Sequence, residues 1–277
     1  MKSSAFWAVL CAACIAGSAG LFIKSMSISP VSQAWLRMAI PTIVMAIWMR
    51  LEGIAFFRGN WKKMTLISIM GTVRMVLFFV AYTYATIGNA VIIFYTFPIF
   101  SAIFGFVLLR EQVNRRQQLL LLMAFTGIVL AFSNKPFSLE SNDFIGMMAA
   151  MASALIYALT VVLFKSESKN YSWKELVFYQ NFSGLILLLP FFQFGAAMAL
   201  DYTLGITYGL LIGVIVFGLF FFGLKRLPAS IAAALMYMEV VSAIVLSTLF
   251  MGEQLSWPMI FGGILILGSS LLLKRTS

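Results

Sequence analysis

Three ionisable side chains lie inside apolar segments that are long enough to cross a bilayer. They are Arg37, Arg74 and Glu239, whereas the other charged residues lie between such segments. Placing an ionisable group in hydrocarbon costs about 2.5–3.5 kcal/mol, even on scales derived from membrane insertion. These residues therefore indicate a polar site, lined by protein or water, through which something crosses the membrane.

The composition defines the class of protein. Of the 277 residues, 62% are hydrophobic and 10% are charged, whereas a soluble domain has about a quarter charged residues. The chain is therefore predicted to be an integral membrane protein with room for about ten spans. The net charge of +10 is interpreted as a topology signal at the lipid surface, so no nucleic acid is expected as a partner.

The apolar segments predict an all-α membrane protein with ten transmembrane helices. They are too long and too uniformly apolar for the alternating strands of an outer-membrane barrel. Pro30, Pro228 and Pro258 would open three of the helices, where a missing amide donor costs little. The predicted spans are 4–23, 30–49, 64–85, 88–109, 116–132, 143–164, 174–194, 205–224, 228–250 and 257–273.

Lysine and arginine positions predict the orientation. With the N-terminus in the cytoplasm, 15 of the 19 basic residues fall in cytoplasmic segments and only Lys24 and Lys135 fall outside. This bias favours an even number of spans with both termini cytoplasmic, in the cytoplasmic (inner) membrane of a bacterium.

The two halves of the chain resemble each other. With a shift of 142 positions, Leu77-Phe78-Phe79 coincides with Leu219-Phe220-Phe221, and Tyr95 coincides with Tyr237. Residues 1–134 and 135–277 are therefore predicted to be two five-helix repeats of one membrane domain. Because five is odd, the second repeat must insert inverted. Inverted repeats are typical of secondary transporters, whose substrate site lies between the repeats.

Two stretches carry a family resemblance, Gly71 to Glu111 and Gly213 to Glu253. Each consists of a span, a tight turn and a second span that ends in a glutamate. Ala34 to Arg37 matches an arginine-bearing second span, and Met238-Glu239-Val240 matches a Leu-Glu-Pro-Val motif with valine in place of proline. On these motifs the chain resembles the ten-span EamA-type drug/metabolite transporters, which include YddG-like exporters of amino acids and other metabolites. The resemblance implies a cavity walled by spans 1, 3, 4, 6, 8 and 9.

Arg74 is the first candidate ligand. Helical spacing places it on one face with Gly71, Phe78 and Tyr82. A guanidinium group binds a carboxylate or phosphate through two hydrogen bonds, although a structural ion pair is the alternative. Arg37 lies nearer the outer end of its span, where it could bind substrate, pair with an acid or reach the interface.

Glu239 leaves three interpretations open. It could bind a cationic group of the substrate, carry a proton, or pair structurally with Arg37 or Arg74. The resemblance implies further ligands on the cavity wall, namely Trp7, Ser18, Tyr82, Tyr95, Tyr157 and Tyr237.

We therefore expect a secondary active transporter that moves a small polar or zwitterionic, amino-acid-like metabolite by alternating access. Arg74 would bind a carboxylate, Glu239 an ammonium group and the aromatic residues a side chain. A proton or a counter-substrate is the candidate coupling species, and the protein would be a monomer or weak oligomer. The alternatives are a carrier of an organic cation or nucleoside-like metabolite, and a channel or non-transporting scaffold.

Neither an enzyme nor a cofactor or metal site is expected. The chain has no histidine, and its two cysteines, Cys11 and Cys14, lie inside the first span. A redox pair needs water-accessible thiols, so the cysteines are interpreted as small helix-packing residues.

Overall fold

The computed structural model describes residues 2–134, 141–195, 198–252 and 254–274. Every regular element within these residues is a helix, which confirms the all-α class. The elements are α1 (Lys2–Ala16), α2 (Ala19–Ser25), α3 (Pro30–Leu51), α4 (Trp61–Tyr84), α5 (Ile87–Phe94), α6 (Phe97–Leu109), α7 (Arg115–Ala131), α8 (Ser141–Glu167), α9 (Trp173–Leu187), the 3-10 turn η1 (Leu189–Phe191), α10 (Ala199–Tyr208), the π-helical η2 (Gly209–Val216), α11 (Phe217–Leu224), α12 (Ala229–Leu235), α13 (Met238–Met251) and α14 (Trp257–Leu273).

Seven helical segments of the described chain are long and apolar enough to cross a membrane. They are Ser3–Ser25, Pro30–Leu51, Trp61–Tyr84, Asn89–Leu109, Asp143–Glu167, Ala199–Leu224 and Ala229–Met251. The predicted fifth, seventh and tenth spans coincide with α7, α9 and α14, which have 17, 15 and 17 residues. These three helices are shorter, so the full set of ten transmembrane helices stays a prediction.

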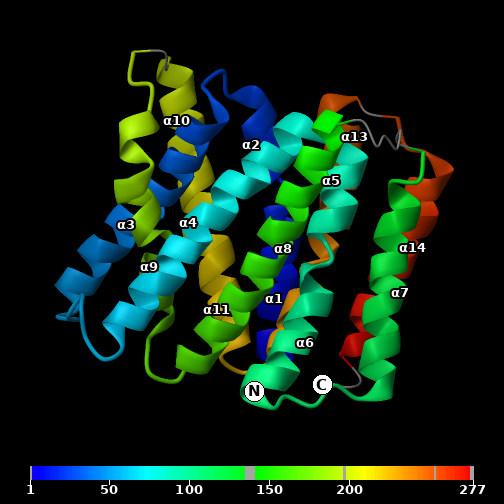
Figure 1. Cartoon of the computed structure of the whole chain (residues 1–277), viewed down its shortest axis with the longest axis horizontal. Coiled ribbons are helices and arrows are strands. Elements are labelled where there is room, and N and C mark those ends of the chain that lie inside the picture. Colours follow the sequence, from blue (N-terminus) through cyan, green and yellow to red (C-terminus); the bar gives the residue numbers. More distant parts are fainter. Residues whose placement is uncertain (1, 135–140, 196–197, 253, 275–277) are drawn as a thin grey trace.

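The helices stand side by side, and both chain ends lie at the same end of the bundle (Figure 1). We call this the terminus end, and the opposite end the far end. Helix α4 packs on α8, α3 on α9, α7 on α14, and α1 on η2 and α11. Each pair joins one half of the chain to the other. The inverted repeat itself stays a prediction, and both its boundary at 134/135 and Glu253 involve residues outside the described part.

Helices α7 and α14 meet through glycine. A Cβ on Gly127 would lie 2.7 Å from the carbonyl oxygen of Gly262 and 2.9 Å from a side-chain carbon of Ile266. Two backbones approach this closely only where a side chain is missing, as is common between membrane helices. The two glycines therefore hold the ends of the two halves together.

Three of the predicted spans are interrupted in the structure. The breaks separate α1 from α2, α5 from α6, and α12 from α13. Pro98 lies in the first turn of α6 and has no amide hydrogen to continue α5. Its counterpart under the 142-residue shift is Val240, yet α12 and α13 are still separate. Proline is therefore not what breaks the helix in the second half.

The end of α6 leads to a prediction about stability. Arg110 has φ 54°, in the left-handed region, whereas the equivalent end of α13 uses Gly252 at φ 67°. Left-handed backbone costs a residue with a side chain about 1–2 kcal/mol. Arg110→Gly should therefore raise the free energy of unfolding by about 1 kcal/mol, measured by thermal unfolding in detergent. Arg116→Gly, inside α7, should lower it by about 1 kcal/mol. Equal losses in both variants would contradict the argument.

Candidate functional site

A cavity of about 120 Å³, which we call the inner chamber, lies among α2 to α5, α8, α11 and α13 and contains three charged side chains. They are Arg37 from α3, Arg74 from α4 and Glu239 from α13. The structure thus brings together the three ionisable residues singled out by the sequence. Half of the remaining lining residues are aromatic, namely Phe78, Phe94, Phe97, Tyr157, Tyr208, Phe217 and Phe220.

Arg74 is buried, and its guanidinium carbon lies 4.6 Å from the centre of the Tyr157 ring. Within the described residues no oxygen accepts a hydrogen bond from its guanidinium group, and its Nε is buried without a partner. An arginine side chain offers five donors. The cation–π contact with the Tyr157 ring stabilises the positive charge of Arg74 in part. It leaves the guanidinium N–H donors available to a ligand in the chamber.

Arg37 is held more firmly, by groups from the second half of the chain. Its Nη1 donates to Oδ1 of Asn181 over 3.4 Å. The guanidinium carbon lies 4.9 Å from the Phe217 ring centre, and Tyr208 lines the same chamber. Asn181 and Phe217 are neutral, so the positive charge of Arg37 is not cancelled by these groups.

Glu239 lies in the first turn of α13, just after the break from α12. The positive end of a helix dipole stabilises a carboxylate at this position. Tyr95, at the break between α5 and α6, lines the same larger neighbouring cavity as Glu239. Among the described residues, no ion pair of 4.0 Å or less includes Glu239. Its attraction to Arg37 and Arg74 therefore acts across the chamber and not through direct contact.

A second cavity of about 470 Å³, the outer vestibule, adjoins the inner chamber and shares Phe78, Phe94 and Glu239 with it. Tyr82 and Tyr95 line the vestibule only. The vestibule continues past these residues to the far end of the bundle, where its lining residues include Lys24, Pro30, Thr83 and Met259. The two cavities together form a path from the far end to the charged centre.

Three sequence-predicted ligands lie outside both cavity linings. Trp7 is 43% exposed on the outside of the bundle, where the Lys274 ammonium nitrogen lies 4.6 Å from its ring centre. Ser18, next to the break between α1 and α2, donates its hydroxyl to the carbonyl of Ile15 over 2.7 Å. Tyr237 is fully buried beside Tyr95, with ring centres 6.2 Å apart, and its hydroxyl has no hydrogen-bond partner among the described residues.

Asn181, the hydrogen-bond partner of Arg37, and Tyr208, on the chamber wall, are not among the residues predicted from the sequence. An asparagine inside the predicted span 174–194 was the available signal, because polar residues are rare at membrane depth. Tyr208 had no such signal, because tyrosine near the start of a span is typical of an interfacial anchor.

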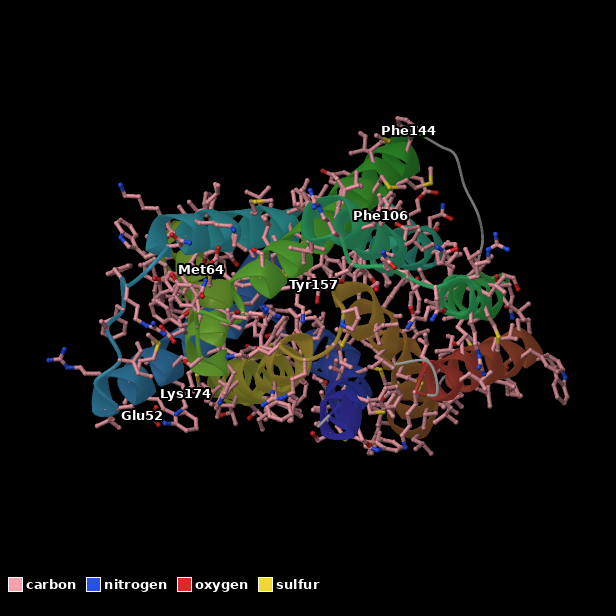
Figure 2. The ribbon with its side chains drawn as sticks, turned by 90° about the horizontal axis from the view of Figure 1, so that it is seen from below. Glu52, Met64, Phe106, Phe144, Tyr157 and Lys174 are labelled. Carbon is pink, nitrogen blue, oxygen red and sulfur yellow. The ribbon has the colours of Figure 1, made fainter. Side chains whose placement is uncertain are left out.

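At the terminus end, ion pairs connect the segment after α3 and the first turn of α4 to the helices α8 and α9. Arg58 donates to both carboxylate oxygens of Glu175, over 2.6 and 2.8 Å, and Lys63 pairs with Glu167 over 2.7 Å. Lys174 pairs with Glu52 at the edge of the bundle, while Tyr157 lies near its middle (Figure 2). The hydrogen bond from Lys174 holds the pKa of Glu52 below its usual range.

Carbonyl contacts add to this closure. The Lys165 ammonium group donates to the carbonyl of Leu224 over 2.6 Å, and that of Lys225 to the carbonyl of Tyr171 over 2.8 Å. One Glu111 carboxylate oxygen accepts from the backbone N–H of Ala229, at the start of α12, over 2.7 Å. Glu111 therefore joins the end of α6 to the start of α12 in the second half, which agrees with its interpretation as a helix-terminal residue.

Comparison with known proteins places this chain among membrane transporters. The model of the EamA-like transporter family matches residues 3–133 and 144–275. The uncharacterized transporter YxxF of Bacillus subtilis is 25% identical, over 95% of this chain and 88% of its own length. The pseudopaline exporter CntI of Pseudomonas aeruginosa is 25% identical, over 100% of this chain and 97% of its own length. A solved crystal structure matches with a TM-score of 0.85 at 18% identity and covers 100% of both chains, which shows a shared fold.

Proposed function

The chain belongs to the EamA-like transporter family, and from that premise we propose that it moves a small zwitterionic, amino-acid-like metabolite by alternating access. The cargo binds in the inner chamber. Its carboxylate contacts Arg74, its ammonium group contacts Glu239, and its remaining atoms pack on Phe78 and Phe94. The similarity to a protein named as a pseudopaline exporter favours export as the direction of transport.

One observation carries this proposal: among the residues that the structure describes, Arg74 has no hydrogen-bond acceptor and Glu239 has no ion-pair partner, although both line one chamber. Unpaired charges at membrane depth are costly and are typical of substrate and ion pathways. Opposite charges on facing walls match the two charged groups of an amino acid. An organic cation fits less well, because Arg37 and Arg74 would repel it.

Alternating access is supported by a difference between the far end and the terminus end of the bundle. The vestibule extends from the chamber to the far end, whereas ion pairs connect the helices at the terminus end. The interrupted helices α5–α6 and α12–α13 meet beside Glu239, and transporters commonly build their substrate sites at such breaks. With cytoplasmic termini, this conformation is outward-facing, and the inward-facing one requires the ion pairs to separate.

Counterflow in proteoliposomes tests the function directly. Vesicles loaded with one unlabelled metabolite at a time are given a trace of the labelled form, and a carrier accumulates the label transiently. We expect saturable accumulation for amino acids and none for nucleosides or quaternary amines. Accumulation of nucleosides alone would replace the proposed substrate class. Flux that does not saturate would indicate a channel.

The orientation gives a labelling prediction. In a chain with Cys11→Ser and Cys14→Ser, Gln193→Cys should react with an impermeant thiol reagent applied outside intact cells. Lys169→Cys should react only after the membrane is opened, because positively charged connections stay in the cytoplasm. Both positions are exposed, so reactivity reports sidedness rather than burial. External labelling of Lys169→Cys would reverse the proposed topology.

The closure at the terminus end gives a third prediction. Arg58→Gln removes the ion pair with Glu175 and should shift the population toward the inward-facing state. Val161, buried on α8 between the chamber and the terminus end, provides the reporter. Modification of Val161→Cys from the cytoplasmic side should become about two- to fivefold faster, given the energy of a partly exposed ion pair. Arg116→Gln, far from the closure, should leave the rate unchanged, and an unchanged rate in Arg58→Gln would contradict the gating role.

A further inference from the structure

The inner chamber contains more positive than negative charge. Its ionisable lining consists of two arginines, Arg37 and Arg74, and one carboxylic acid, Glu239, together with two tyrosines. Arginine stays protonated in proteins. With Glu239 ionised the chamber has a net charge of +1, and with Glu239 protonated it has +2. A cationic excess therefore remains whichever form Glu239 takes.

Among the residues that the structure describes, no group in contact with the two arginines cancels this excess charge. Arg37 and Arg74 repel each other across the chamber. The hydrogen-bond partner of Arg37 is a neutral amide, and this contact with Asn181 is long, at 3.4 Å. Arg74 contacts the face of an aromatic ring. A charge removed from water needs an opposite charge nearby, so the chamber is suited to a ligand with a net negative charge.

A neutral zwitterion compensates only part of the positive charge in the chamber. Its carboxylate would pair with Arg74 and its ammonium group with Glu239, and the charge of Arg37 would stay uncompensated. A second acidic group on the ligand removes the imbalance, because three charges on the ligand then face three opposite charges on the wall. The adjoining vestibule provides space for the rest of a ligand that is longer than the inner chamber.

We propose that the cargo is an acidic zwitterion, a metabolite with two anionic groups and one ammonium group, and that Arg37 binds the second anion. This inference rests on the proposed transport of amino-acid-like metabolites and specifies the substrate class. Arg37 thereby becomes the residue that selects acidic over neutral cargo, while Arg74 and Glu239 bind the groups common to both.

Pairs of ligands that differ by one charge test the proposal. Binding to the purified full chain in nanodiscs is measured by calorimetry for L-glutamate against L-glutamine and for L-aspartate against L-asparagine. Glutarate serves as the acid that lacks an amine. The acidic member of at least one pair should bind about 10- to 100-fold more tightly than its amide, the range expected of one charged hydrogen-bonding contact.

Two substitutions then assign this preference to Arg37. Arg37→Gln should reduce the acid-to-amide ratio to below about threefold while the affinity for the amide is retained. Asn181→Asp places a carboxylate next to Arg37 with almost no change in shape, and it should reduce the same ratio even where Arg37→Gln fails to fold. Arg116→Gln, exposed on α7, serves as the matched control and should keep the wild-type ratio.

The outcomes separate this inference from the function on which it rests. Equal binding of acid and amide by the wild type, with counterflow of neutral amino acids, would overturn the acidic cargo and leave the transport proposal standing. Failure of every amino acid to bind and to exchange would overturn both. An acid preference that survives both Arg37→Gln and Asn181→Asp would remove Arg37 from selection.

Discussion

Replacing Arg74 with methionine is expected to abolish substrate binding and, in the same variant, to raise the stability of the ligand-free protein. The two effects have one cause, which is that the guanidinium group has no protein acceptor in the described chain. Removing one partner of a buried charge pair typically costs 2–5 kcal/mol of binding free energy, which corresponds to a loss of affinity of about 30-fold or more.

The sign of the stability effect follows from the magnitudes. Arg74 gains about 0.5–2 kcal/mol from its contact with the Tyr157 ring. An ion moved from water into a protein interior without a partner loses several kcal/mol. The loss is larger than the gain, so an apolar side chain of similar length should stabilise the empty transporter.

Thermal unfolding and binding of the amino acid identified by counterflow measure the two effects. Arg74→Lys should bind about 10- to 100-fold more weakly than the wild type, because an ammonium group does not reproduce the two parallel hydrogen bonds of a guanidinium. Arg50→Met, exposed at the end of α3, should change neither property. Lower stability of ligand-free Arg74→Met, together with normal binding, would assign Arg74 a structural role.

The sequence predicts the helices better than their interruptions. Runs of apolar residues define where a helix crosses hydrocarbon, because every backbone group there must bond within the helix. They carry no information about a local break that neighbouring helices make tolerable. Gly17, at the end of α1, illustrates this: a Cβ there would lie 2.6 Å from the backbone nitrogen of Ala243 on α13. That contact depends on residues more than 200 positions away in the chain.

The candidate site was predictable to the extent that charge alone reveals it. Arg37, Arg74 and Glu239 were identified because ionisable groups are rare at membrane depth, and the structure brings all three to one chamber. Aromatic residues gave a weaker signal, since tryptophan and tyrosine also serve as lipid-interface anchors and packing residues. Trp7 and Tyr237 accordingly lie outside the cavities, whereas Tyr157 lines the chamber.

Replacing Glu239 with glutamine is expected to weaken binding of amine-containing substrates about 10- to 100-fold, the range for losing a hydrogen bond to a charged group. Glutamine preserves the shape of the side chain, so thermal stability should change little. Glutarate, which lacks an ammonium group, should bind at least as well as before, since the variant removes a negative charge that opposes a dianion. The ratio between glutamate and glutarate affinity therefore isolates the ammonium contact.

The same variant separates the other two interpretations of Glu239. A proton carrier would lose accumulation driven by a pH gradient while substrate exchange at equal pH continued. A structural partner of the arginines would lose thermal stability, and combining the change with Arg37→Gln would restore part of it. The structure argues against that last outcome, because no arginine nitrogen in the described chain lies within 4.0 Å of the Glu239 carboxylate. Unchanged affinity for glutamate in Glu239→Gln would exclude Glu239 as the ammonium ligand, and the substrate amine would then have to bind on the aromatic faces of the chamber.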